Sequence, residues 1–289
     1  MAALSEDAQA GARDCGTFML ELVGTFAPSQ VSMRWSDAPR ATCEAVDRLI
    51  EQTWTDHGAR AERDGLMFFD GPLCRLADWS ANNGALVLTL GPVSYKEFLG
   101  TNATHANLRY AHGSEVLADP LGVSAAMTTA DHFVLLGRRS HHVVQYARRI
   151  HPVGGLVAPS ETPDKPPDPF TTMQAELDEE LALPVDCIAS MRCIGLVRDK
   201  HTAQPELILD VAADADVTAI RRAQKDAADA CEHTGLEAVR NDAGSMVNFI
   251  EQRYAELTPV ALATLLLHGL HSWGTGWFAA ARGYCRSVI

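Results

Sequence analysis

Apolar runs separated by turn signals predict a series of β-strands through the chain. Residues 85–90 read Ala-Leu-Val-Leu-Thr-Leu and are followed at once by Gly91-Pro92, which is typical of a buried strand ended by a turn. Residues 132–139 form a second strand that is first apolar and then basic. We expect further strands at 193–197 and 206–211, and a short segment, 143–146, that pairs with the strand at 132–139.

Helical spacing of apolar residues predicts four helices. In the first, Val46, Leu49 and Ile50 share one face. The last has an N-terminal signal, because Thr258 is placed to cap it and Pro259 suits the first helical position. The four predicted helices span residues 40–54, 168–183, 220–232 and 259–271.

The order of these elements favours an α+β fold over a doubly wound sheet, because strands come first, then a central acidic helix, more strands and a closing helix. Residues 158–169 are too rich in proline for a helix or a central strand. We interpret this segment as a loop inserted within one domain.

Composition narrows the classes of function. The chain has 289 residues, 47% of them hydrophobic, and a formal net charge of -13, which argues against general binding to nucleic acid or to anionic membranes. The acidic N-terminal residues 1–13 lack a secretory pattern, and the apolar run at 260–270 is too short to cross a bilayer. Seven cysteines without a C-x-x-C pair indicate reduced thiols, so we predict a cytoplasmic location.

The helix at 168–183 carries the candidate chemistry. Its apolar stripe must face the core, and Glu176, Glu179 and Glu180 form a second stripe roughly 110° away, whereas Asp178 points elsewhere. Clustered carboxylates repel one another, and hard oxygen ligands suit magnesium, with manganese as the alternative. The stripe residues are Phe170, Met173, Leu177 and Leu181.

A simpler interpretation stands beside this one, because a Glu-rich helical turn is more often a solvated surface than a metal site.

The segment from the strand at 132–139 to this helix resembles the Nudix hydrolase family, whose motif is G-x5-E-x7-R-E-U-x-E-E-x-G-U, with U a bulky aliphatic residue. Gly155 and Glu161 match its first half. The spacer after Glu161 has thirteen residues where the motif has seven, and Ala175 and Ala182 replace the motif Arg and Gly. The second half is matched by Glu176, Leu177, Glu179, Glu180 and Leu183. The resemblance implies that the three glutamates bind magnesium and that Glu161 is a further motif carboxylate.

Two more strings, S-Y-K-E-F-L-G-T-N at 94–102 and L-A-D-P-L-G-V at 117–123, are similar to a two-domain Nudix subgroup that includes UDP-glucose/UDP-galactose diphosphatases. The similarity runs from about residue 66 to 183 and more weakly to 273. It implies a Nudix α/β/α sandwich with a mixed sheet at 123–289, preceded by a smaller α+β domain at 1–122 that helps to bind substrate.

The subgroup's activity implies hydrolysis of a UDP-sugar to UMP and a sugar 1-phosphate. Tyr95 or Phe98 could stack on the base, Asn102 or Asp119 could bond to base or ribose, and arginine could reach phosphate. Glu206 is a candidate for a further metal carboxylate or the general base. The complete candidate substrate set is Tyr95, Phe98, Asn102, Asp119, Arg138, Arg139 and Gly155.

Each assignment has a structural alternative. Tyr95 and Phe98 could be core residues, and at most one of Arg138 and Arg139 can face the site, because they alternate along a strand. His151 and the pair 141–142 are interpreted as surface residues. Residues 232–235 are another place for a pocket residue, but we favour a helix end closed by Gly235.

The alternatives for function are another substrate (GDP-mannose, ADP-ribose or a dinucleotide) and a catalytically silent Nudix fold that senses a nucleotide. A homodimer stays open.

Overall fold

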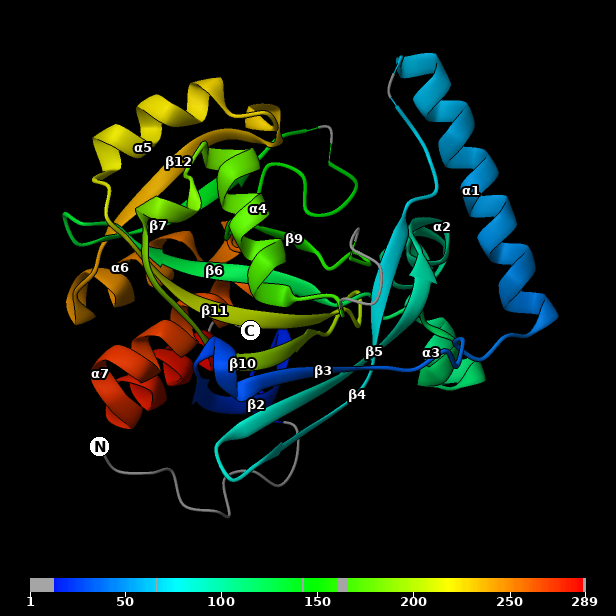
Figure 1. Ribbon diagram of the computed structural model, residues 1–289, viewed down its shortest axis with the longest axis horizontal. Helices are drawn as coiled ribbons and strands as arrows, with labels where there is room; N and C mark the ends of the chain where they lie inside the picture. Colours follow the sequence, from blue (N-terminus) through cyan, green and yellow to red (C-terminus); the bar gives the residue numbers. More distant parts are fainter. Residues whose placement is uncertain (1–12, 66, 142, 161–165, 288–289) are drawn as a thin grey trace.

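The protein is described here by a computed structural model that covers residues 13–65, 67–141, 143–160 and 166–287. Its largest feature is a nine-stranded mixed sheet (Figure 1). The main path runs β1-β2-β10-β11-β6-β7-β12, while β8 pairs with β7 and β9 pairs with β6. The strands of this sheet are β1 (Arg13–Asp14), β2 (Phe18–Phe26), β6 (Gly122–Thr128), β7 (Phe133–Arg139), β8 (Ile150–His151), β9 (Gly154–Leu156), β10 (Ile188–Asp199), β11 (Pro205–Ala213) and β12 (His233–Arg240).

A second, three-stranded sheet has the order β3-β5-β4 and lies toward the other end of the molecule (Figure 1). Three helices accompany it, and the long helix α1 stands at the outer edge, where it packs against a π-helical turn at Leu99–Ala103. The elements are β3 (Val31–Trp35), β4 (Pro72–Asn82), β5 (Ala85–Ser94), α1 (Glu44–Asp64), α2 (Tyr95–Phe98) and α3 (Leu108–His112).

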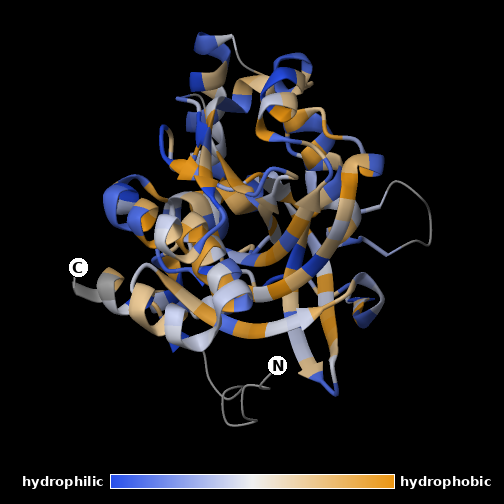
Figure 2. Cartoon of the chain, turned by 90° about the vertical axis from the view of Figure 1, so that its left-hand side faces the viewer, coloured by the Kyte–Doolittle hydropathy of each residue, from blue (hydrophilic) through white to orange (hydrophobic). Residues whose placement is uncertain are grey.

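Helices cover both faces of the large sheet, which makes an α/β/α sandwich. Leu177 and Leu181 of α4 pack in one core cluster with Leu207 of β11. Ile208, the next residue of β11, packs instead with α7 in the second cluster. Hydrophobic residues concentrate along the central strands (Figure 2). The helices are α4 (Pro169–Leu181), α5 (Val217–Ala223), α6 (Ala243–Arg253) and α7 (Pro259–Ser287). The predicted α+β class and sandwich are therefore confirmed.

Local signals in the sequence explain α4. The Asp168 carboxylate accepts a hydrogen bond from the backbone N–H of Phe170, and Pro169 occupies the first turn, as predicted. Ala182 ends the helix in the left-handed conformation, at φ 51°. The Ala182 position is the one where the family motif has Gly, the residue that adopts this backbone conformation at lowest cost. All four residues of the predicted apolar stripe are buried.

Two predicted elements are wrong. Residues 143–146 form no strand, because Tyr146 and Arg148 take positive φ values in a tight turn, and β7 pairs with β8 instead. The helix predicted at 220–232 ends at Ala223, since the chain then bends back and the Asp229 N–H donates to the Glu179 carbonyl of α4. The predicted cap of α7 is confirmed, because Thr258 Oγ1 accepts from the Ala261 N–H. α7 runs beyond the predicted end, with non-helical backbone at Gly274.

The start of the chain belongs to the large sheet, because β2 pairs with β10 along most of its length. The three-stranded sheet and its helices, residues 31–112, therefore lie between strands of the large sheet in the sequence. The predicted division at residues 122 and 123 stays a prediction about domains. Within the described residues, no helix is long and apolar enough to cross a membrane.

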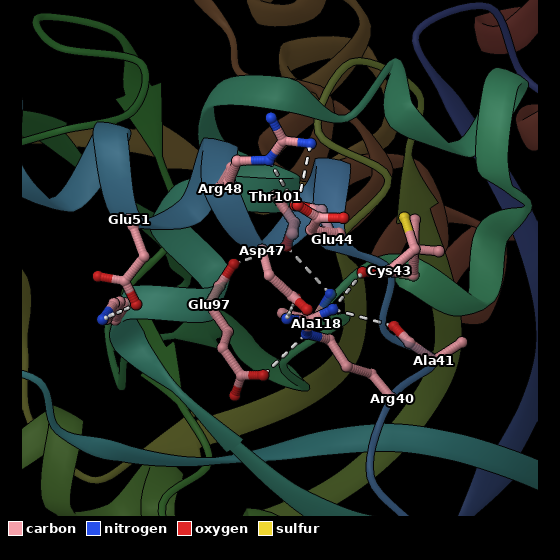
Figure 3. Close-up of polar contacts among 12 residues, drawn as sticks. Arg40, Ala41, Cys43, Glu44, Asp47, Arg48, Glu51, Glu97, Thr101 and Ala118 are labelled. Atoms are coloured by element: carbon pink, nitrogen blue, oxygen red, sulfur yellow. Dashed lines mark hydrogen bonds and ion pairs between the residues drawn. The ribbon is translucent and has the colours of Figure 1, made fainter.

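A buried arginine fixes α1 to the segment that carries α2 (Figure 3). Arg40 is 5% exposed, and its guanidinium contacts Glu97 Oε1 at 2.8 Å and Asp47 Oδ1 at 3.0 Å. Glu97 also accepts from the Ser94 N–H, so one carboxylate joins the helix start to Arg40. Nearby, Arg48 pairs with Glu44 on the exposed face of α1, with exposed fractions of 75% and 86%.

We expect Arg40→Met to lower the free energy of unfolding by about 2 kcal/mol or more, because charge-assisted hydrogen bonds to a buried group are lost. Arg48→Met serves as the control and should cost less than about 0.5 kcal/mol, since its ion pair is exposed. Urea unfolding of both variants measures the difference. Equal effects in the two variants would contradict the role assigned to Arg40.

Candidate active site

Glu176 and Glu180, two of the three predicted glutamates, lie against Gly154 and Gly155 of β9. Glu176 lies directly over Gly155, where a methyl group would overlap its carboxylate. The Gly154 N–H donates to Glu180 Oε1 at 3.4 Å. Because β9 offers backbone without side chains here, α4 can press both carboxylates against the sheet. Glu179 is exposed on the outer side of this helix.

The two inner carboxyl groups are in an environment that disfavours two negative charges. Burial raises the pKa of Glu176 and of Glu180, and the charges of neighbouring glutamates add to the increase. A hydrogen bond between the two carboxyl groups raises the pKa of Glu176 and lowers that of Glu180. One proton shared between them, or a cation, relieves the repulsion.

His233 also contacts this pair, and the sequence analysis assigned it wrongly to a helix end. It starts β12, is 7% exposed, and its Nε2 contacts Glu180 Oε2. Burial lowers the pKa of His233 to about 4. The sequence offered residues 232–235 as a place for a pocket residue, but the helix end was favoured. The position of His233 depends on the pairing of β12 with β7, which brings together segments far apart in the sequence.

The side chains of Arg138 and Arg139 make different contacts, as their alternation along β7 predicts. Arg138 pairs with Glu237 at 2.7 Å and with Glu256 at 2.8 Å, away from α4. Burial lowers the pKa of Arg139, and the charges of Glu232, Glu180 and Glu206 act in the opposite direction, so this guanidinium lies among carboxylates.

The Arg139 Nε donates to the Gln145 carbonyl at 3.0 Å. In the part of the chain that the structure describes, no hydrogen bond is made by the two terminal nitrogens of Arg139.

Glu206 lies on the other face of the sheet. It alternates with Leu207 along β11, and since Leu207 packs with α4, the Glu206 side chain leaves toward α7. Ser124 Oγ donates to its Oε1 at 2.6 Å, and Gln204 Nε2 to its Oε2 at 3.2 Å. Burial raises the pKa of Glu206 to about 8. The structure thus does not place this carboxylate in the α4 cluster.

Tyr95 and Phe98, the residues predicted to stack on the base, are packed in a hydrophobic cluster beside the three-stranded sheet. The Tyr95 ring lies 6.1 Å from that of Phe98 and 6.4 Å from that of Trp54, centroid to centroid. Phe98 is buried with Leu73 and Val93. Both aromatic residues thus have the core environment that the sequence analysis gave as their alternative.

Asn102 and Asp119 bind each other. Asn102 Nδ2 donates to Asp119 Oδ1 at 2.8 Å and to the Thr202 carbonyl at 3.0 Å, and its Oδ1 accepts from the Asp119 N–H at 2.8 Å. Arg198 Nη1 donates to Asp119 Oδ2 at 2.8 Å, while its Nε donates to Glu21. These contacts connect the smaller module to β2, to β10 and to the turn before β11.

His151 was predicted at the surface, and the structure corrects this. It lies partly buried on β8, where Nδ1 is 2.8 Å from Thr258 Oγ1. Burial lowers the pKa of His151 well below its usual value, and the positive charges of Arg139 and His233 add to the effect. Of the neighbouring pair at 141–142, residue 142 lies outside the described residues, as does Glu161.

The donor chemistry of this cluster fits a divalent cation. Glu176 and Glu180 offer carboxylate oxygens in mutual contact, Gly155 leaves room beside them, and Glu179 follows on the same helix. Among the residues that the structure describes, however, no group of three or more His, Cys, Asp or Glu side chains is already gathered as a metal site. Glu179 would have to turn inward to complete one.

Several known proteins match parts of this chain. A human protein named uridine diphosphate glucose pyrophosphatase NUDT22 is 30% identical over 161 residues, which cover 47% of this chain and 53% of that protein. The mouse protein of the same name is 28% identical and covers 63% of this chain and 66% of that protein. The chain thus spans about half to two thirds of these relatives.

Nudix hydrolase 9 of Arabidopsis thaliana is 25% identical over 78% of this chain and 82% of that protein. A solved MutT protein from Methanosarcina mazei aligns at 16% identity over 53% of this chain and 95% of that chain, with a TM-score of 0.34. No family model matches.

The chain is thus similar in sequence to proteins named uridine diphosphate glucose pyrophosphatase and to one named as a Nudix hydrolase, in agreement with the family and the subgroup that the sequence strings indicated.

The environment of Glu206 gives a test by pH. A carboxyl group with a raised pKa keeps, in the folded protein, a proton that the unfolded chain has released, so stability falls as pH rises from about 4.5 to about 8. The buried histidines with lowered pKa contribute a slope of the opposite sign near pH 6.5, and this contribution is the same in both proteins and cancels in their difference. Metal-free Glu206→Gln should therefore lose less stability than wild type between pH 6.5 and 8, by about 1.4 kcal/mol per pH unit. Urea unfolding measures both slopes, and equal slopes would show that Glu206 is ionised throughout.

Proposed function

We propose that this protein hydrolyses the diphosphate bond of a nucleotide sugar in a magnesium-dependent reaction, with UDP-glucose or UDP-galactose giving UMP and a sugar 1-phosphate. The observation that carries the proposal is the pair of buried, mutually repelling carboxylates of Glu176 and Glu180, held by α4 over Gly154 and Gly155. The names of the related proteins support the substrate class.

The residues divide the work by charge. Glu176, Glu179 and Glu180 would hold the magnesium ion, with manganese as the alternative. When bound, such an ion neutralises charge on the diphosphate and lowers the pKa of an attacking water. The carboxylates cost less to keep ionised beside a cation, because each otherwise bears the charge of the other in a poorly solvated place.

Arg139 binds a phosphate oxygen in this proposal. Its guanidinium lies near Glu180, and its terminal nitrogens can donate a forked pair of hydrogen bonds to an oxyanion. Glu206 enters as a charge partner of Arg139 rather than as a ligand, because its side chain leaves the other face of the sheet. Gly155 contributes space, and Tyr95, Phe98, Asn102 and Asp119 contribute the frame that holds the two sheets together.

The partners and location follow from the same argument. A small nucleotide sugar is the proposed partner, with no nucleic acid and no membrane, and the cytoplasmic location stays a prediction from composition. Whether two copies associate also stays a prediction.

We expect Glu180→Gln and Glu176→Gln each to lower turnover by roughly 100-fold or more, on the scale of losing one electrostatic contact to the transition state. Asp178→Asn, on the exposed side of the same helix, is the matched control and should keep wild-type turnover. Turnover of UDP-glucose, UDP-galactose, GDP-mannose and ADP-ribose, with and without magnesium, is measured with an added phosphatase that releases inorganic phosphate from the phosphomonoester products but not from the substrates. Nucleotide binding without magnesium-dependent turnover of any of these would instead identify a silent binding protein.

The two neighbouring arginines give a second matched pair. Arg139→Gln should weaken binding of the nucleotide sugar by about tenfold or more, because a charge-assisted hydrogen bond to phosphate is lost. Arg138→Gln should leave that affinity unchanged but lower the melting temperature, since Glu237 and Glu256 lose their partner. Calorimetric titration and thermal unfolding separate the two effects. The reverse result would mean that the wrong arginine has been assigned to phosphate.

A further inference from the structure

A bulge at the start of β12 directs one histidine side chain toward the acidic helix. His233 pairs with Arg139, and the next partners are Gly235 and Arg138, so one extra residue is inserted in β12 at this point. Such a bulge turns a side chain away from the regular alternation, and bulges of this kind are common beside active sites. Here it accompanies an imidazole that is almost completely buried.

The His233 ring packs directly against the backbone of Gly137 on β7. Any side chain at position 137 would overlap the imidazole, because the position of a Cβ atom there coincides with the region around Nδ1. Nδ1 is buried and has no hydrogen-bond partner among the described residues. The ring is thus fixed on one side by a backbone surface, and Nε2 is its one polar atom in use.

The Glu180 carboxylate is held at both oxygens by two different strands. Gly154 N–H of β9 donates to Oε1, and His233 Nε2 of β12 contacts Oε2. Glu179, one residue earlier on α4, is exposed. When Glu180 is ionised, a proton on His233 Nε2 donates to Oε2, and the carboxylate cannot rotate without losing one of the two contacts.

We propose that His233 is a positioning residue that sets the affinity of the site for a divalent cation by fixing the orientation of Glu180. The proposal rests on the proposed function, because it assigns Glu180 as a metal ligand. A ligand that is already oriented loses less freedom when a cation binds, and removing such an outer contact typically weakens metal affinity by about 10- to 100-fold.

Two substitutions of His233 separate its two nitrogens. In His233→Gln the side-chain amide nitrogen can take the place of Nε2, and in His233→Asn it takes the place of Nδ1. We expect His233→Gln to bind Mn²⁺ within a few-fold of wild type and His233→Asn to bind about 10- to 100-fold more weakly. A histidine that served only to fill space would not distinguish the two amides in this way.

Two glycine substitutions test the packing of the His233 ring against Gly137. Gly137→Ala should displace the ring and weaken Mn²⁺ binding in the same way as His233→Asn. Gly235→Ala is the matched control on β12, because nothing lies within 4 Å of a Cβ atom built there, and it should bind as wild type does. This pair decides the question if a substituted histidine prevents folding.

Calorimetric titration of the metal-free proteins with Mn²⁺, after thermal unfolding has shown that each variant is folded, gives the affinities without requiring turnover. If wild type binds Mn²⁺ and His233→Asn binds it equally well, the positioning role is overturned while the proposed function stands. Equal losses in His233→Gln and His233→Asn also overturn it. If wild type takes up no Mn²⁺ at all, the metal assignment of Glu180 fails first.

Discussion

The structure depends on bringing two like charges into a place where water cannot separate them. Glu176 and Glu180 lie one helical turn apart on α4, and the apolar stripe of this helix fixes which way they face. Burying that stripe is favourable, and it carries the two carboxylates against the sheet whether or not a counter-charge is present. The repulsion between the two carboxylates favours binding of a positive charge, because a cation or an arginine beside them lowers the energy of that repulsion.

The N-terminal module is attached to the large sheet by a shared apolar core, in which Leu86 and Leu88 of β5 belong to the same cluster as Leu207 of β11, and by polar contacts. The asparagine that ends the string at 94–102 joins Asp119 to the turn before β11, and Arg198 extends the network to Glu21. The string is distinctive in sequence because a buried amide that satisfies its partners in this way tolerates few substitutes. Its distinctiveness reflects this structural role as much as any contact with substrate.

Sequence patterns were informative where a segment's structure depends on its own residues. The cap at Asp168, the apolar stripe and the strand at 85–90 were all predicted, although this strand continues past its expected end at Gly91-Pro92 to Ser94. Glu176, Glu179 and Glu180 were predicted as one stripe, whereas only Glu176 and Glu180 face the sheet. The signals failed where distant segments decide. The alanine-rich segment after Ala223 has helical propensity, yet a bond to α4 bends it, and His233 acquires its place only through the pairing of β12 with β7. Glu206 was assigned to the right strand, but its face could not be known without the packing of Leu207.

The position of β2 in the large sheet has a consequence for how the protein is built. Because β2 pairs with one side of β10 and β11 with the other, the 12-residue strand β10 is not an edge strand of the sheet. A fragment beginning at residue 123 would leave the free N–H and C=O groups of β10 as an open sheet margin, a template for association with other chains. The smaller module therefore lies between strands of the larger one in the order of the chain, and the two are expected to fold as a single unit.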